Sequence, residues 1–176
     1  MIKSIAPAFT ALALCGCATV DTPPVQPDWA SAATATLRDS AGNIAGTADL
    51  LRRGDEWKLG LGVSGQTPGD HGIHLHMVGK CTAPDFTSAG GHLNPAGKAH
   101  GSANPAGMHM GDLPNLTIGA DGTASTFMAL PAGIDPAALF DADGTAIVIH
   151  AKPDDYRTDP AGNSGPRLAC GVLTAK

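Results

Sequence analysis

Residues 44–63, IAGTADLLRRGDEWKLGLGV, place two β-prone runs on either side of a turn at RRGD. Two such runs joined by a glycine-containing turn are typical of a β-hairpin. Similar runs, separated by turn residues, fill the rest of the chain: residues 33–39, 72–78, 116–118, 125–130, 146–152 and 168–175. About eight strands at this spacing favour an antiparallel sandwich or closed barrel. No run has a convincing 3.6-residue period, so we expect no substantial helix.

The composition of the chain is that of one globular β-rich domain. The 176 residues are 43% hydrophobic and only 4% aromatic, with 23 glycines and 14 prolines. Such a chain is long enough for a real core, and its glycine and proline content favours strands and turns. The net charge of −5 and the lack of a Lys/Arg cluster argue against nucleic-acid binding.

The N-terminus has the features of a secretory signal. One early lysine precedes an apolar run and the sequence Leu14-Cys15-Gly16-Cys17, which resembles a bacterial lipoprotein cleavage box. We expect residues 1–16 to be a signal peptide, Cys17 to carry lipid, and residues 17–28 to form a Pro-rich tether to a domain over 29–176. The alternative is an ordinary signal peptide cut near Ala18. Either reading predicts export to the bacterial periplasm or cell envelope, and the first adds membrane attachment.

The cysteine count agrees with export. If Cys15 leaves with the signal and Cys17 carries lipid, Cys81 and Cys170 remain as an even pair in an oxidising compartment. They predict one disulfide, and closing so long a loop contributes about 4 kcal/mol in the chain-entropy model. Two unpaired buried thiols are the alternative.

The histidines are concentrated in and around a long loop. Two stretches, residues 79–112 and 152–166, are too long for turns, and loops of that length in a compact domain are usually functional or disordered. His74 and His76 fall on the same face of a predicted strand, where a metal ion would use both neutral rings at once. Other ligand-type side chains follow: His92, His100, His109, Asp112 and His150. They divide naturally into an imidazole-rich set, which suits copper, and a His/Asp set, which suits zinc.

Five motifs give these residues a family context. HGIHLHMVGKC, GGHLNP, HMGDLPNL, IVIHAKPDD and GNSGPRLACGV occur in this order over nearly all of residues 30–176. In these stretches the chain resembles a Cu/Zn superoxide dismutase of the exported bacterial type. The resemblance implies an eight-stranded Greek-key β-barrel with two long functional loops, one copper and one zinc. It also implies conversion of superoxide to dioxygen and hydrogen peroxide, by alternate reduction and oxidation of copper.

The resemblance assigns the metal ligands residue by residue. It implies that His92 bridges both metals and exchanges a proton, while zinc has no redox role. The implied copper ligands are His74, His76, His92 and His150, and the implied zinc ligands are His92, His100, His109 and Asp112. Cys81 and Cys170 match the disulfide of the family.

Further residues are implied to act around the metals. Asp154 matches an aspartate that hydrogen-bonds one copper ligand and one zinc ligand, although the adjacent Asp155 is a second candidate for this role. Arg167 matches the arginine that attracts the substrate anion beside copper, or it pairs with an acid. His71 lies on the strand face opposite His74, which predicts a hydrogen-bonded structural histidine.

Three further residues bear on the reaction rate, and two alternative functions fit the same fold. Lys80 and Lys98 are candidates to steer superoxide toward a protein whose net charge is negative. Pro166 stands beside Arg167, where the family leads us to expect a small residue, and constrains its neighbour. A non-enzymatic copper-binding or copper-delivery module on the same fold is the alternative function, and a structural lipoprotein is a third. The oligomeric state cannot be predicted.

Overall fold

The computed structural model of the protein describes residues 28–176. The predicted signal peptide, Cys17 and all but the last residue of the predicted tether lie outside this range. Within it, no helix is both long enough and apolar enough to span a membrane.

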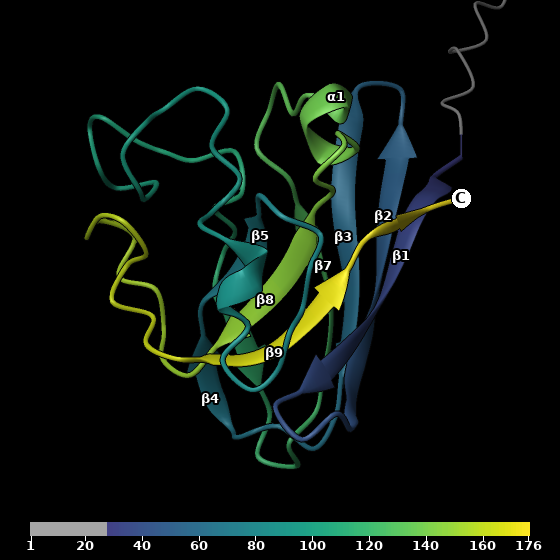
Figure 1. The fold of residues 1–176 in the computed structure, drawn as a ribbon, viewed down its shortest axis with the longest axis vertical. Coiled ribbons are helices and arrows are strands. Elements are labelled where there is room, and N and C mark those ends of the chain that lie inside the picture. The colour runs from purple at the N-terminus through teal and green to yellow at the C-terminus, as the bar shows by residue number, and fades with distance from the viewer. Residues whose placement is uncertain (1–27) are drawn as a thin grey trace, which may run out of the picture.

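Ten strands and two very short helices make up the described domain. Seven of the strands form a curled antiparallel sheet in the order β5-β8-β9-β1-β2-β3-β7, with β10 paired to β1, and β4 pairs separately with β6 (Figure 1). The strands are β1 (Ala30–Asp39), β2 (Ile44–Arg53), β3 (Glu56–Val63), β4 (Gly69–His71), β5 (Ile73–His76), β6 (Leu116–Ile118), β7 (Ala124–Ala129), β8 (Ala146–His150), β9 (Arg167–Val172) and β10 (Thr174–Ala175). The helices are a 3-10 turn, η1 (Thr87–Ala89), and α1 (Pro136–Leu139).

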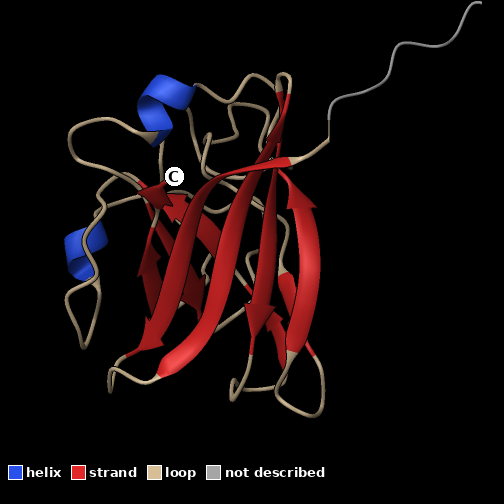
Figure 2. Ribbon diagram, turned by 90° about the vertical axis from the view of Figure 1, so that its right-hand side faces the viewer, coloured by secondary structure: helices blue, strands red, loops and turns tan. Residues whose placement is uncertain are grey.

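The expected β fold is confirmed, and three details differ from it. The large sheet curls on itself, as Figure 2 shows, but in the described residues its edge strands β5 and β7 do not pair with each other. The strand expected over 168–175 is interrupted at Leu173, whose backbone N–H donates to Thr145 instead. The short strand β4, which the sequence did not predict separately, precedes β5 and pairs with β6.

The core lies on the inner side of the curled sheet because side chains alternate along each strand. In β3, Trp57, Leu59, Leu61 and Val63 are all buried in one cluster. On the neighbouring strand β2, Gly46 faces Gly62 so closely that a Cβ on Gly46 would lie 2.3 Å from the Gly62 carbonyl oxygen. The stretch quoted above therefore forms the hairpin that the sequence predicts, with most of its apolar residues inside and Ile44 exposed at the start of β2.

The disulfide predicted from the cysteine count is present. Cys81 and Cys170 are bonded, across 89 residues of sequence. The bond attaches the start of the first long loop to β9, close to the second cluster of buried apolar residues around Phe86 and Val148. This loop and the second long loop lie on the side of the domain away from the first described residues (Figure 1).

Candidate metal centre

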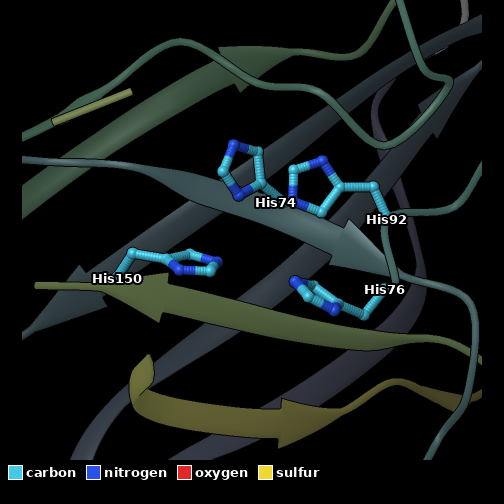
Figure 3. Close-up of side chains that lie close together, drawn as sticks. All are labelled: His74, His76, His92 and His150. Carbon is cyan, nitrogen blue, oxygen red and sulfur yellow. The ribbon is translucent and has the colours of Figure 1, made fainter. Parts of the chain in front are cut away.

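Two adjacent strands supply three of the histidines. His74 and His76 stand on β5 and His150 ends β8, which pairs with β5. All three side chains are buried, and the ring centroids of His74 and His150 lie 4.9 Å apart. Figure 3 shows the rings around a common space, together with that of His92 (Figure 3). The alternation that places His74 and His76 on one face is thus realised.

The first long loop reaches the site because two of its segments, one in its middle and one at its end, pair with the outer edge of β5. His76 forms a bridge with His92, and His74 forms one with Asp112. Between them, the Leu75 N–H donates to the Gly111 carbonyl, and the Leu93 N–H donates to that of Leu75. A Cβ on Gly111 would lie 2.3 Å from the Leu75 oxygen, so this close approach requires glycine. The sheet edge is thereby covered and the loop ligands are set beside the strand ligands.

Four nitrogen atoms face the common space without a hydrogen-bond partner. They are the only buried side-chain nitrogen or oxygen atoms in residues 28–176 for which no partner is found: Nδ1 of His74, Nε2 of His76, Nε2 of His92 and Nε2 of His150. Each of the four histidines offers one ring nitrogen as a ligand atom, and these atoms lie within 4.8 Å of one another. Buried polar atoms are normally paired, so four unpaired nitrogens aimed at one point indicate a site that can bind a cation.

The protonation of these rings suits that cation. Burial, with smaller contributions from neighbouring histidines, lowers the pKa of His76 to about 2, of His150 to about 3 and of His92 to about 4. The other nitrogen of His76 donates to the Gly90 carbonyl at 2.9 Å, and that of His150 faces the Gly165 carbonyl at 3.2 Å. These contacts fix the ring orientations, and neutral imidazole is the form that binds metal.

A second set of donors converges on the opposite side of His92. Its Nδ1 lies 2.9 Å from Asp112 Oδ1 and 3.3 Å from Nδ1 of His109. The same Asp112 oxygen lies 3.0 Å from His100 Nδ1 and 3.2 Å from His109 Nδ1. Ligands around tetrahedral zinc are separated by roughly 3.3 Å, given metal–nitrogen distances of about 2.0–2.1 Å. The spacing of these four atoms therefore matches a zinc site.

His74 also lies near this second set, with a ring nitrogen within 4.8 Å of ligand atoms of His92, His100 and Asp112. However, its Nε2 already donates to Asp154 Oδ2 at 2.8 Å, and its Nδ1 is one of the four orphan atoms. His74 therefore belongs to the first set, and His109 completes the second.

Charge holds the second set together. Burial would lower the pKa of His100, but hydrogen bonds with Asp112 and Asp154 outweigh it and raise that pKa to about 9. Burial would likewise raise the pKa of Asp112, but hydrogen bonds from His100 and His92 keep it well below its usual range. His100 and Asp112 therefore form a buried, charge-assisted pair within this set.

Asp154 connects the two sets. Its Oδ2 accepts from His74 Nε2 at 2.8 Å, and its Oδ1 accepts from His100 Nε2 at 2.9 Å. Asp155, the other candidate, is exposed and accepts hydrogen bonds from Thr158 and Asn163 within its own loop. A Cβ on Gly162 would lie 1.8 Å from Asp154 Oδ1, so this residue must be glycine for the loop to pack on the pair.

A channel of about 410 Å³ leads to the first set. It is lined by His76, His92 and His150, and by Arg167 and Lys98. The Arg167 guanidinium donates to the carbonyls of Phe86 at 2.6 Å and Gly90 at 2.7 Å. No carboxylate among residues 28–176 forms a salt bridge with it, although the charge of Asp85 acts on it from further away. Burial lowers the pKa of Arg167, but arginine remains charged in proteins. Lys80 lies next to the disulfide and Lys98 lines the channel.

The structure also places residues that sequence reasoning treated otherwise or missed. His71 is buried, and its two ring nitrogens lie 2.7 and 2.9 Å from the carbonyls of His150 and Thr67, as expected of a structural histidine. Asn115, which was not singled out, exchanges two hydrogen bonds with the backbone of Asp154. Asp159 accepts from the His100 backbone N–H at 2.6 Å. The only sequence signal for the last two was their place beside or within the long loops.

Comparison with known proteins gives a consistent family. The profile of the family described as Copper/zinc superoxide dismutase (SODC) matches residues 44–173. Superoxide dismutase [Cu-Zn] 2 of Aquifex aeolicus is 42% identical over 147 residues, which cover 80% of this chain and 85% of the relative. Superoxide dismutase [Cu-Zn] of Caulobacter vibrioides is 43% identical over 148 residues, covering 80% and 84%.

Solved structures agree with the sequence matches. The crystal structure of a SOD-like protein from Bacillus subtilis superposes with a TM-score of 0.77 at 37% identity, covering 82% of this chain and all of that one. Cu/Zn superoxide dismutase from Brucella abortus superposes with a TM-score of 0.68 at 28% identity, covering 84% and 100%.

Proposed function

The chain belongs to the copper/zinc superoxide dismutase family, and on this premise we propose that it converts superoxide to dioxygen and hydrogen peroxide. The observation that carries the proposal is the position of His92. One of its nitrogens faces three orphan nitrogens of neighbouring histidines, and the other faces a His₂Asp set at tetrahedral spacing. One imidazole is thus shared by two different donor sets.

The donor sets determine which residues would hold which metal. An all-imidazole set suits copper, and we assign it His74, His76, His92 and His150. A set with a carboxylate at tetrahedral spacing suits zinc, and we assign it His92, His100, His109 and Asp112. Copper supplies the one-electron exchange that dismutation requires, and zinc supplies a fixed positive charge that favours deprotonated His92.

His92 is the proton carrier in this proposal. Its Nε2 is buried at the inner end of the channel, with no protein partner in the described residues, so it can accept a proton and release it again. Its Nδ1 is held by the second donor set, which keeps the ring in place while the proton moves. Hydrogen peroxide needs two protons, and His92 delivers one of them where the product forms.

Arg167 attracts and orients the substrate. Superoxide is a small anion, and the net charge of the chain is −5, so attraction must come from local charge. The guanidinium lines the channel beside the copper ligands and donates to two backbone carbonyls, which fix its position while it keeps its positive charge. Focusing of this kind raises association rates by about 10- to 10³-fold.

A test of this function compares turnover with metal binding. Superoxide consumption should depend on copper content in the purified protein loaded with both metals, and should fall in Arg167→Ala while copper still binds. The second candidate is a copper-binding or copper-delivery module. The observation that favours it is that the four inward nitrogens could bind copper whether or not the protein turns over superoxide. Stoichiometric copper binding with no superoxide consumption in the parent protein would establish that candidate instead.

We further propose that the protein is exported and attached to a membrane by lipid on Cys17. The sequence around Cys17 supports this, and a Cys81–Cys170 disulfide suits an oxidising compartment such as the periplasm. Mass spectrometry of the N-terminal peptide from membrane fractions tests it, with Cys17→Ser as the matched variant. We expect lipid on Cys17 and release of the variant; a mature chain beginning near Ala18 without lipid would contradict it.

A further inference from the structure

Asp159 connects the two long loops at a point where the zinc ligands meet the channel. It lies in the second loop, and its Oδ1 accepts a hydrogen bond of 2.6 Å from the backbone N–H of His100 in the first loop. The same oxygen lies 3.9 Å from Nε2 of His109. One carboxylate thus faces two residues of the proposed zinc set.

The surroundings of Asp159 differ from those of the other carboxylates in the site. The side chains of Asp112 and Asp154 are 4% and 0% exposed and contact ring nitrogens directly. The side chain of Asp159 is 58% exposed, and it is the one carboxylate among the described residues that line the channel. Its negative charge therefore faces the path of an anionic substrate, opposite in sign to Lys98 and Arg167.

The zinc-side geometry gives Asp159 a role toward His109. Nδ1 of that ring points at Asp112 and His92, so its Nε2 carries the proton when Nδ1 binds metal. Metal-bound histidines almost always give that N–H to a carboxylate, carbonyl or water, and losing the partner typically weakens metal binding about 10- to 100-fold. Asp154 already serves His100 in this way, and Asp159 is the carboxylate nearest to the His109 N–H.

From these contacts we propose that Asp159 is a positioning residue that retains zinc at the expense of substrate attraction. It holds the His100 backbone through a hydrogen bond and faces the His109 ring from 3.9 Å, within ion-pair distance, and its charge opposes superoxide in the channel. Only the part that concerns substrate attraction rests on the proposed function, because zinc retention can be measured without turnover. Removing the carboxylate should therefore weaken zinc binding and, once zinc is saturating, accelerate the reaction with superoxide.

Two substitutions separate the two effects. Asp159→Ala removes both the hydrogen-bond acceptor and the charge, while Asp159→Asn keeps an oxygen for the His100 N–H and removes only the charge. Asp155→Asn is the matched control, because it also removes one negative charge from the same loop. Asp155 is exposed, contacts only its own loop and does not line the channel.

Zinc affinity is measured first, by competition with a chromogenic chelator, with the visible spectrum of cobalt in the zinc site as a second readout. We expect Asp159→Ala to bind zinc about 10- to 100-fold more weakly and Asp159→Asn to be less affected. Asp155→Asn should match the parent. Unchanged zinc affinity and an unchanged cobalt spectrum in Asp159→Ala would overturn the positioning role.

Superoxide consumption is then measured at saturating copper and zinc across a range of ionic strength. We expect kcat/KM of Asp159→Asn to rise roughly twofold or more at low salt and to fall more steeply as salt is added, since screening removes the gained attraction. Asp155→Asn should change less. A rate equal to or below that of the parent in zinc-saturated Asp159→Asn would overturn the steering half. Absence of turnover in the parent would instead refute the proposed function and leave the zinc result standing.

Discussion

The copper side and the zinc side of the histidine cluster are built in opposite ways. On the copper side, strands β5 and β8 hold three of the four rings, and four nitrogens point inward with no partner. On the zinc side, all four ligands come from the first long loop, and every donor already contacts a carboxylate or another ring. The sheet therefore prepares the copper site, whereas carboxylates hold the zinc ligands together.

This difference assigns separate tasks to the two sides. Burial lowers the pKa of His76 and His150 and keeps these two rings neutral, and the channel that reaches them is positively charged at Arg167. The carboxylates on the zinc side are buried at Asp112 and Asp154, out of reach of the substrate. His92 is the one ring that belongs to both sides.

The largest effect is expected for His92→Ala, because it alters both sides at once. The substitution removes one ligand from each set and the proposed proton carrier, so superoxide consumption should fall at least about 100-fold. Zinc affinity should fall as well. The measurement is kcat/KM with copper and zinc content determined on the same sample, and a variant that keeps both metals and parental turnover would break the comparison.

Asp154→Ala should have the next largest effect, again on both sides, but through the rings it orients. The substitution leaves the Nε2 atoms of His74 and His100 buried without their carboxylate, so affinity for each metal should fall about 10- to 100-fold. Asp155→Ala is the control and should leave both affinities unchanged. Loss of zinc alone in Asp154→Ala would show that the sheet fixes His74 without help from this residue.

Arg167→Ala should weaken the attraction of the substrate and leave the affinity for both metals unchanged. We expect kcat/KM to fall by roughly 10-fold, the lower end of the range for electrostatic focusing, with a flatter dependence on ionic strength. Arg167→Lys keeps the charge but loses the two-carbonyl contact, so it should fall between the parent and the alanine variant. Equal losses in both would indicate that position, and not charge, is what this residue provides.

Hydrogen exchange tests whether the strands fix the copper site and the carboxylates hold the zinc loop, and it needs no measurement of turnover. In the metal-free protein, amides of residues 98–111 should exchange faster than those of β5 and β8, because the loop depends on the carboxylates and the strands are in the sheet. Zinc alone should slow the loop amides, and copper should slow them much less. If the amides of the loop and of the strands were equally protected without metal, the proposed difference between the copper side, fixed by the sheet, and the zinc side, held by carboxylates, would be wrong.

The sequence predicts the strands and the shared face of His74 and His76, because both follow from local periodicity. The ligand sets were predicted from the resemblance of the motifs, because local periodicity does not indicate that His92 lies beside His76. That contact depends on two segments of the loop, around His92 and Asp112, pairing with the edge of β5, and the close approach of Gly111 to Leu75 requires glycine.

Other features depend on contacts distant in sequence. The contacts of Asp154 with two histidines, the carbonyl partners of Arg167 and the hydrogen bond from His100 to Asp159 all join segments separated by long stretches of chain. None of these leaves a local signature. The break between β9 and β10 depends on a hydrogen bond from Leu173 to Thr145, which no periodicity indicates.

The most direct test of the account is a crystal structure of the protein loaded with copper and zinc, with anomalous scattering data at the absorption edge of each metal. We predict two peaks on opposite sides of His92, copper at Nε2 with His74, His76 and His150, and zinc at Nδ1 with the second donor set. A single occupied site, or a metal pair in which His92 binds only one ion, would contradict the claim that this ring joins the two sides.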